Sequence, residues 1–137
     1  MYELGLGVLQ DYAEAAKWYR LGAEQGDSRS QNSLGTSYLT GEGVPEDYVE
    51  STKWYRRAAE QGHNKAQYNL GLQYNMGWGV LQSYVSAHMW LNIASVNGQP
   101  NGGKMRDAIA AQMTTADIAE SQRRARVCLE SDYQNCD

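Results

Sequence analysis

The sequence has no phenylalanine, only two prolines and two cysteines, and no long run of hydrophobic residues. A membrane-spanning helix needs about 20 consecutive apolar residues, and a secretory leader begins with a basic stretch followed by an apolar one. Neither pattern is present, so we expect no membrane span and interpret the sequence as a soluble chain that is already processed or truncated. The composition, with 42% hydrophobic residues, favours a packed fold over a disordered chain or a disulfide scaffold.

Positive charge is also scarce. The chain has 12 lysines and arginines against 16 aspartates and glutamates, which gives a net charge of −4. The basic residues are spread along the chain, whereas nucleic-acid-binding proteins gather them into a stripe that faces the phosphates. The charge pattern therefore excludes nucleic acid as a partner.

Residues and motifs that carry catalytic chemistry are missing as well. His63 and His88 are the only histidines, and no cysteine or carboxylate cluster with the spacing of metal ligands surrounds them. The sequence contains no nucleophile elbow, no zinc-protease helix and no phosphate-binding loop. We therefore predict no metal site, no cofactor and no catalytic residue, and we expect that the protein is not an enzyme.

What the sequence does contain is a repeat of 36 residues. Residues 27–62 and 63–98 are identical at 12 of 36 positions, and residues 1–26 and 37–62 are identical at 15 of 26. The recurring positions include Trp18, Trp54 and Trp90, Tyr12, Tyr48 and Tyr84, Gly26, Gly62 and Gly98, Gly7, Gly43 and Gly79, and Val8, Val44 and Val80. Such a period predicts stacked structural units, which we divide into a partial repeat (1–26), two full repeats (27–62 and 63–98) and a C-terminal part (99–137).

Each unit is predicted to form two helices joined by a glycine turn. In the second unit, the helical spacing of apolar residues predicts a first helix over residues 28–40. Glycines and a proline end it at 41–45, and a second helix then runs from Asp47 to Gly62. The Gly-x-Gly turns follow helices rather than strands, so they are not phosphate-binding loops. The recurring tryptophans and tyrosines are interpreted as core residues.

Capping signals mark the start of the second helix in two units. Asp47 and Glu50 have the spacing of a capping box, and Asp11 and Glu14 repeat that spacing 36 residues earlier. The first unit is therefore predicted to contain its second helix as residues 12–25.

The third unit carries the pattern most completely. It reads Leu70-Gly71-x-x-Tyr74-x-x-Gly77-x-Gly79-Val80, followed by Tyr84, Ala87, Trp90, Ala94 and Gly98. This string resembles the Sel-one-like repeat (SLR), a relative of the tetratricopeptide repeat. The resemblance covers residues 1–98 and implies an all-α fold, an α-α superhelix (solenoid) of antiparallel helix pairs. Leu91 replaces the tyrosine of earlier copies, which resembles a final repeat that leads into a cap.

The two ends of the chain differ. Residues 104–113 and 117–129 are predicted to form two capping helices, with Thr114 as an N-cap, and residues 113–120 resemble the closing tail of bacterial members of the family. At the N-terminus, only the last turn of the first helix, residues 2–4, remains. We therefore expect an exposed packing face on the helix 12–25, and self-association through this end.

The two cysteines leave two readings open. Cys128 and Cys136 would lie about 12 Å apart in a continuous helix, which is too far for a disulfide, but residues 131–135 are turn-prone enough to let the helix end between them. This spacing resembles that of exported, cysteine-rich members of the family, in which a disulfide joins two helices. The resemblance implies a disulfide here, and with it an oxidising compartment, periplasmic or secreted in a bacterium. The alternative is two free thiols in a cytosolic protein.

A partner is expected on the concave face, which the resemblance places along the first helix of each unit. On the side away from the core, the second unit presents Arg29, Asn32, Ser33, Thr36 and Thr40, and the third presents Tyr68, Asn69, Leu72, Met76 and, in the turn, Trp78. Aromatic residues beside methionine suit a protein or peptide contact. The alternative is that Leu72 and Met76 pack between helices or under the cap.

These observations predict a non-catalytic protein–protein interaction module, an adaptor or assembly scaffold. The second hypothesis is an accessory hydrolase or a cell-wall-binding activity in the groove, for which the sequence offers no residue constellation.

Overall fold

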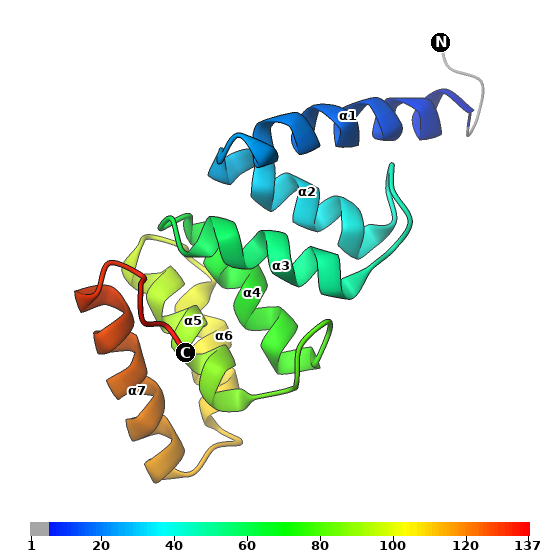
Figure 1. The fold of residues 1–137 in the computed structure, drawn as a ribbon. Helices are drawn as coiled ribbons and strands as arrows, with labels where there is room; N and C mark the ends of the chain where they lie inside the picture. Colours follow the sequence, from blue (N-terminus) through cyan, green and yellow to red (C-terminus); the bar gives the residue numbers. More distant parts are fainter. Residues whose placement is uncertain (1–5) are drawn as a thin grey trace.

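The computed structural model describes residues 6–137, and there it consists of helices without strands (Figure 1). The helices are α1 (Leu6–Glu24), α2 (Ser28–Thr40), α3 (Tyr48–Ala59), α4 (Asn64–Met76), α5 (Tyr84–Val96), α6 (Gly102–Ala110) and α7 (Thr115–Glu130). Helices α1 to α5 stack in chain order, and α6 and α7 both pack on α5, so that α1 and α7 lie at opposite ends. The predicted all-α architecture is confirmed.

The turn after α2 and the turn after α4 are built on two glycines each. Gly41 and Gly77 end their helices in the left-handed conformation, with φ of 74° and 71°. Two residues later, an added Cβ at Gly43 would lie 2.2 Å from the carbonyl oxygen of Tyr12, and one at Gly79 would lie 2.1 Å from that of Tyr48. Each turn therefore rests directly on the second helix of the preceding unit.

Helix α1 differs from the prediction at its start. It runs without a break from Leu6 through Asp11, so Asp11 does not cap a helix and the predicted start at residue 12 is wrong. Gly7, the repeat equivalent of Gly43 and Gly79, lies inside this helix. In the later units a preceding helix holds the glycine turn, and in the described part of the chain no helix precedes α1. The expected remnant at residues 2–4 lies outside the described residues.

Helix α3 begins at Asp47, as predicted, but with only half of the capping box. The Asp47 carboxylate accepts a hydrogen bond from the Glu50 backbone N–H at 3.1 Å. The Asp47 N–H donates to the carbonyl oxygen of Tyr38 at 2.9 Å instead of to Glu50. Glu50 lies 3.8 Å from Lys53. The reciprocal bond is absent because the preceding helix already satisfies its donor.

Helices α4 and α7 are among those that also begin with side-chain caps. His63 caps α4 because its Nδ1 accepts a hydrogen bond from the Ala66 N–H at 3.2 Å. Burial lowers the pKa of His63, which favours the neutral ring that can accept this bond. Thr114 caps α7 by accepting from the Asp117 N–H at 3.1 Å, so this predicted cap is confirmed.

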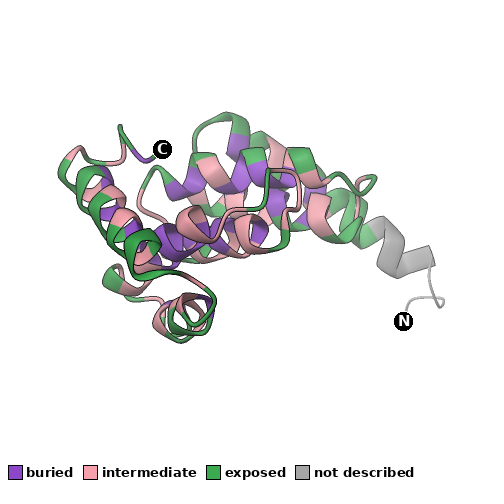
Figure 2. Cartoon of the chain, turned by 90° about the horizontal axis from the view of Figure 1, so that it is seen from below, coloured by how far each residue is buried: buried purple, intermediate pink, exposed green. Residues whose placement is uncertain are grey.

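Helix α5 lies at the centre of the core. Seven of its residues are buried: Ala87, His88, Met89, Trp90, Leu91, Ile93 and Ala94. It is covered by α4, α6 and α7, which explains its strongly apolar sequence. The buried segments run along the inside of the helix row, and the outward side of the C-terminal helix is exposed (Figure 2).

The C-terminal helices cover the last repeat as predicted. Met105, Ile109 and Met113 all contact the cluster around Leu91 of α5. Helix α6 spans Gly102–Ala110 rather than 104–113, because Gly102 lets its first turn approach α5; an added Cβ there would lie 2.8 Å from the Leu91 carbonyl oxygen.

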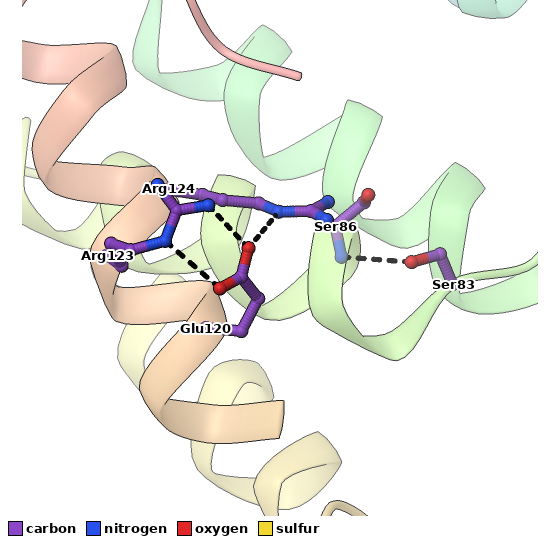
Figure 3. Close-up of polar contacts among 5 residues, drawn as sticks. All are labelled: Ser83, Ser86, Glu120, Arg123 and Arg124. Carbon is purple, nitrogen blue, oxygen red and sulfur yellow. Dashed lines mark hydrogen bonds and ion pairs between the residues drawn. The ribbon is translucent and has the colours of Figure 1, made fainter. Parts of the chain in front are cut away.

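The outer side of α7 is polar. Glu120 accepts hydrogen bonds from Arg123 at 2.6 Å and from Arg124 at 2.9 Å, and these bonds lower the pKa of Glu120 to about 2 (Figure 3). Arg124 extends from there toward α5, where Ser83 caps the helix by accepting from the Ser86 N–H. The helix thus meets water on one side and the core on the other.

A disulfide joins Cys128 in α7 to Cys136 near the C-terminus, with the Cα atoms 4.3 Å apart. The chain turns back after α7 through Asp132 and Tyr133, which have φ of 53° and 66°. The Tyr133 hydroxyl accepts a hydrogen bond from Asn97 at 2.9 Å, and both cysteines belong to the main hydrophobic cluster. The bond therefore holds the C-terminal segment against the core.

We predict that replacing both cysteines by serine lowers the free energy of unfolding by about 2.5 kcal/mol, because a crosslink over eight residues removes that much chain entropy from the unfolded state. Urea denaturation followed by circular dichroism measures it. Dithiothreitol should destabilise the wild type by a similar amount and leave the double-serine variant unchanged. Equal stability of the oxidised wild type and the double-serine variant would contradict the prediction.

Candidate partner-binding groove

An open hollow of about 450 Å³ lies between α1 and α2, at the N-terminal end of the stack. Four of the five residues predicted in the second unit lie in its wall, and Arg29, the fifth, lies outside it and is exposed. The residues that line the groove are Asp11, Tyr12, Ala15 and Tyr19 from α1, Asn32, Ser33, Thr36, Ser37 and Thr40 from α2, and Glu42 from the turn. Sequence reasoning thus found one wall of the groove.

The two walls differ in chemistry. The α1 wall is aromatic, through Tyr12 and Tyr19, and the α2 wall offers hydroxyl and amide groups. Asp11 and Glu42 add two carboxylates, and the lining includes no lysine, arginine or histidine. A hydrogen bond with Glu42, together with its negative charge, raises the pKa of Tyr12. The groove is therefore suited to aromatic contacts and hydrogen bonds with a neutral or basic ligand.

The residues predicted in the third unit do not form one exposed surface. Tyr68 and Leu72 are half-buried against Leu91 and Ile109, so they pack under the cap. Met76 is 53% exposed and stands apart from them. This packing is the alternative that the sequence left open for Leu72, and it arises because α6 covers this side of α4.

Asn69 and Trp78 also have structural contacts. Asn69 Nδ2 donates a hydrogen bond to Asn32 Oδ1 at 3.0 Å, which ties α4 to α2. The Trp78 ring stacks on Tyr48, with the ring centroids 5.0 Å apart, and its carbonyl oxygen accepts from Thr52 Oγ1 at 2.8 Å. The turn that carries Trp78 thus rests on the start of α3.

The α1 wall was missed as part of a binding site, although the repeat carries a signal for it. Tyr12, Ala15 and Tyr19 are the equivalents, 36 residues earlier, of Tyr48, Ser51 and Tyr55. Tyr55 is 1% exposed, whereas Tyr19 is 36% exposed. The expected exposed face on α1 is thus present, and self-association through it stays a prediction.

Within residues 6–137 no group of three histidine, cysteine or carboxylate side chains could hold a metal ion. The helices described there are too short or too polar to cross a membrane.

Helix pairs that repeat every 36 residues, with a glycine turn resting on the preceding pair, define an α-helical repeat protein of the solenoid class. The Sel1 repeat pattern matches residues 1–27, 28–63 and 64–98, and the chain therefore belongs to the Sel1 repeat family. Sel1 repeats are a type of protein–protein interaction module. None of the curated proteins matches the chain significantly.

Two bacterial structures are similar to this chain. The first is c5321, a protective antigen of uropathogenic Escherichia coli with an SLR fold, which is 31% identical over 93% of this chain with a TM-score of 0.88. The chain spans only 28% of the length of c5321. The second is a Sel1 repeat protein from Oxalobacter formigenes, which is 39% identical with a TM-score of 0.65, and the match covers 67% of this chain and 69% of that one.

Proposed function

We propose that this chain is a non-catalytic interaction module that binds a protein or peptide partner in the groove between α1 and α2. One observation carries the proposal: four residues predicted as a binding surface, Asn32, Ser33, Thr36 and Thr40, line an open groove with an exposed tyrosine wall. Tyrosine walls beside hydroxyl and amide groups provide contact area together with adaptable hydrogen bonding. The family's role in protein interaction supports the same assignment.

The proposed setting is an oxidising bacterial compartment, either the periplasm or the exterior. The Cys128–Cys136 bond supports it, because disulfides persist in such compartments and are rare in the cytosol. Alkylation of free thiols in protein isolated from its source, followed by mass measurement, tests it. Two labelled cysteines would contradict the proposed compartment.

The binding function is tested by selecting ligands for the wild-type protein from a random peptide library. We expect the selected peptides to bind a Thr36→Arg variant at least tenfold more weakly, because the long cationic side chain fills the groove. Gln122→Arg adds the same charge to the exposed side of α7 and should leave the affinity unchanged. Peptides that bind all three proteins equally would overturn the assignment of the groove, provided that thermal unfolding shows each variant to be folded.

A further inference from the structure

A glycine in the first helix of each full unit makes room for the second helix. An added Cβ at Gly35 in α2 would lie 2.7 Å from the Tyr55 ring and 3.2 Å from the Ser51 carbonyl oxygen. One at Gly71 in α4 would lie 2.8 Å from Leu91 Cγ and 3.3 Å from the Ala87 carbonyl oxygen. The same contact thus occurs twice at equivalent positions, and only glycine allows it.

The leucine before each of these glycines packs against the tryptophan that recurs every 36 residues in the second helix. Leu34 lies in one hydrophobic cluster with Trp54, which is 4% exposed. Leu70 lies in one cluster with Trp90, which is fully buried. In each full unit, the first helix therefore packs its Leu-Gly pair on two residues of the second helix: the leucine on the tryptophan, and the glycine on the next residue.

Helix α1 has the residues against which a first helix packs in the later units, but no such helix covers them in the described part of the chain. Trp18, Tyr19 and Ala15 are the equivalents of Trp54, Tyr55 and Ser51. Trp18 is 63% exposed, and no Leu-Gly helix in the described part of the chain lies over it. The groove lies against two of these residues, Ala15 and Tyr19.

The second wall of the groove matches as well. Where α2 packs against α3, Asn32 accepts a hydrogen bond from Asn69 of α4, and Thr36 shares a 2.8 Å hydrogen bond with the Tyr55 hydroxyl. The equivalents of Asn69 and Tyr55 one unit earlier are Ser33 and Tyr19, and both line the groove. The groove therefore has the position that α2 fills in the next unit.

We propose that the groove binds an α-helix of a separate partner protein, and that this helix carries a Leu-Gly pair with leucine over Trp18 and glycine over Tyr19. This inference rests on the proposed function and names its ligand class. The bound helix runs antiparallel to α1, as α2 does to α3, so its C-terminal turn meets Asp11 and Glu42. Basic residues in that turn complement the two carboxylates and the helix dipole.

A second copy of this chain is a poorer occupant. Its own first helices, α2 and α4, carry the Leu-Gly pair, but Tyr55 already covers Gly35 and Leu91 already covers Gly71. These helices could enter the groove of another copy only by leaving their own units. A helix from a different protein has no such cost.

The test uses a synthetic peptide with the sequence of residues 27–41 followed by two lysines. A crosslink between positions 33 and 37 keeps it helical, and these positions face away from Gly35 because two residues turn a helix by about 200°. Its binding to the full chain is measured by fluorescence anisotropy. We expect saturable binding and at least tenfold weaker binding of peptides with Gly35→Leu or Leu34→Asp. When glutamates replace the lysines, we expect weaker binding that added salt strengthens, because salt screens their repulsion by Asp11 and Glu42.

Variants of the protein complete the test. Trp18→Ala is expected to weaken binding of the helical peptide at least tenfold, whereas Val49→Ala removes an equally exposed apolar side chain from α3 and should have no effect. Equal affinity of the parent and Gly35→Leu peptides would overturn the inference. So would a dimer, seen by sedimentation, that the peptide does not displace.

Two further results distinguish a failure of the helical-ligand inference from a failure of the proposed binding function. If library peptides bind in a manner that depends on Thr36 while no crosslinked helix binds, the proposed function stands and the helical ligand is wrong. If the gene encodes residues before Met1 and a chain expressed with them loses peptide binding, the groove belongs to that segment and the separate partner is wrong.

Discussion

Replacing Gly79 by alanine is expected to lower the free energy of unfolding by about 2–5 kcal/mol. Gly79 has φ of 76°, where a residue with a Cβ costs about 1–2 kcal/mol. The added Cβ would also lie 2.1 Å from the Tyr48 carbonyl oxygen and 2.8 Å from Thr52 Oγ1. The backbone of α3 cannot rotate away as a side chain can, and forcing a group into a packed site costs about 1–3 kcal/mol more.

Gly26 provides the matched control. Its φ is 91°, but an added Cβ would meet no atom within 4 Å, so Gly26→Ala should cost only the conformational part, about 1–2 kcal/mol. Urea denaturation of both variants, followed by circular dichroism, measures the difference. Equal losses would mean that the turn does not rest on α3 as described.

Replacing Trp90 by alanine is expected to lower the free energy of unfolding by about 3–5 kcal/mol, which is the usual cost of removing a large buried aromatic side chain. Trp90 is fully buried among residues of α3, α4, α5 and α7, including Tyr55, Leu70 and Cys128. These elements pack closely around the ring, so they cannot fully refill the cavity.

Trp18→Ala makes the same chemical change in α1, outside the cluster that surrounds Trp90. Because Trp18 is 63% exposed, the substitution should change the stability by less than about 0.5 kcal/mol. Chemical denaturation of the two variants in parallel tests both expectations. A large loss for Trp18→Ala would show that its side chain is covered in solution, either by a second copy or by residues outside the described range.

The contrast between these tryptophans connects stability with function. One repeat position is a core residue where a first helix covers it, as at Trp54 and Trp90, and an exposed residue at Trp18. Within the described residues, α1 therefore presents a surface that has the chemistry of the interior of the stack. A partner helix would bind there by the same contacts that hold the repeats together.

The sequence predicted the local structure of the repeats well. The period of 36 follows from identical residues at that separation. The helix over 28–40, the glycine turns and the caps at Asp47 and Thr114 were predicted correctly because each depends on residues within about four positions of one another. The failed cap at Asp11 shows the limit of this reasoning, since the same residues form a different structure in α1, before which the described residues contain no helix that holds the turn.

The lining of the candidate groove could be predicted only in part. Asn32, Ser33, Thr36 and Thr40 were found because they point away from the core side of their helix, which is a periodicity argument. The same argument selected Tyr68 and Leu72, which α6 covers. It could not reveal that residues of α4 and α6 share one cluster with Leu91 of α5, because that cluster joins segments about 40 residues apart.

The scarcity of phenylalanine, proline, cysteine and positive charge, together with the repeat, determined by themselves that this protein is an α-helical stack without the residues of a known catalytic motif. Tertiary structure alone decided which faces of that stack are covered. It placed Trp78 on Tyr48, brought the chain back to close the Cys128–Cys136 bond, and left the groove between α1 and α2 open. The physical reason is that a helix and its caps form through local hydrogen bonds, whereas the burial of a helix face depends on its neighbour in the stack.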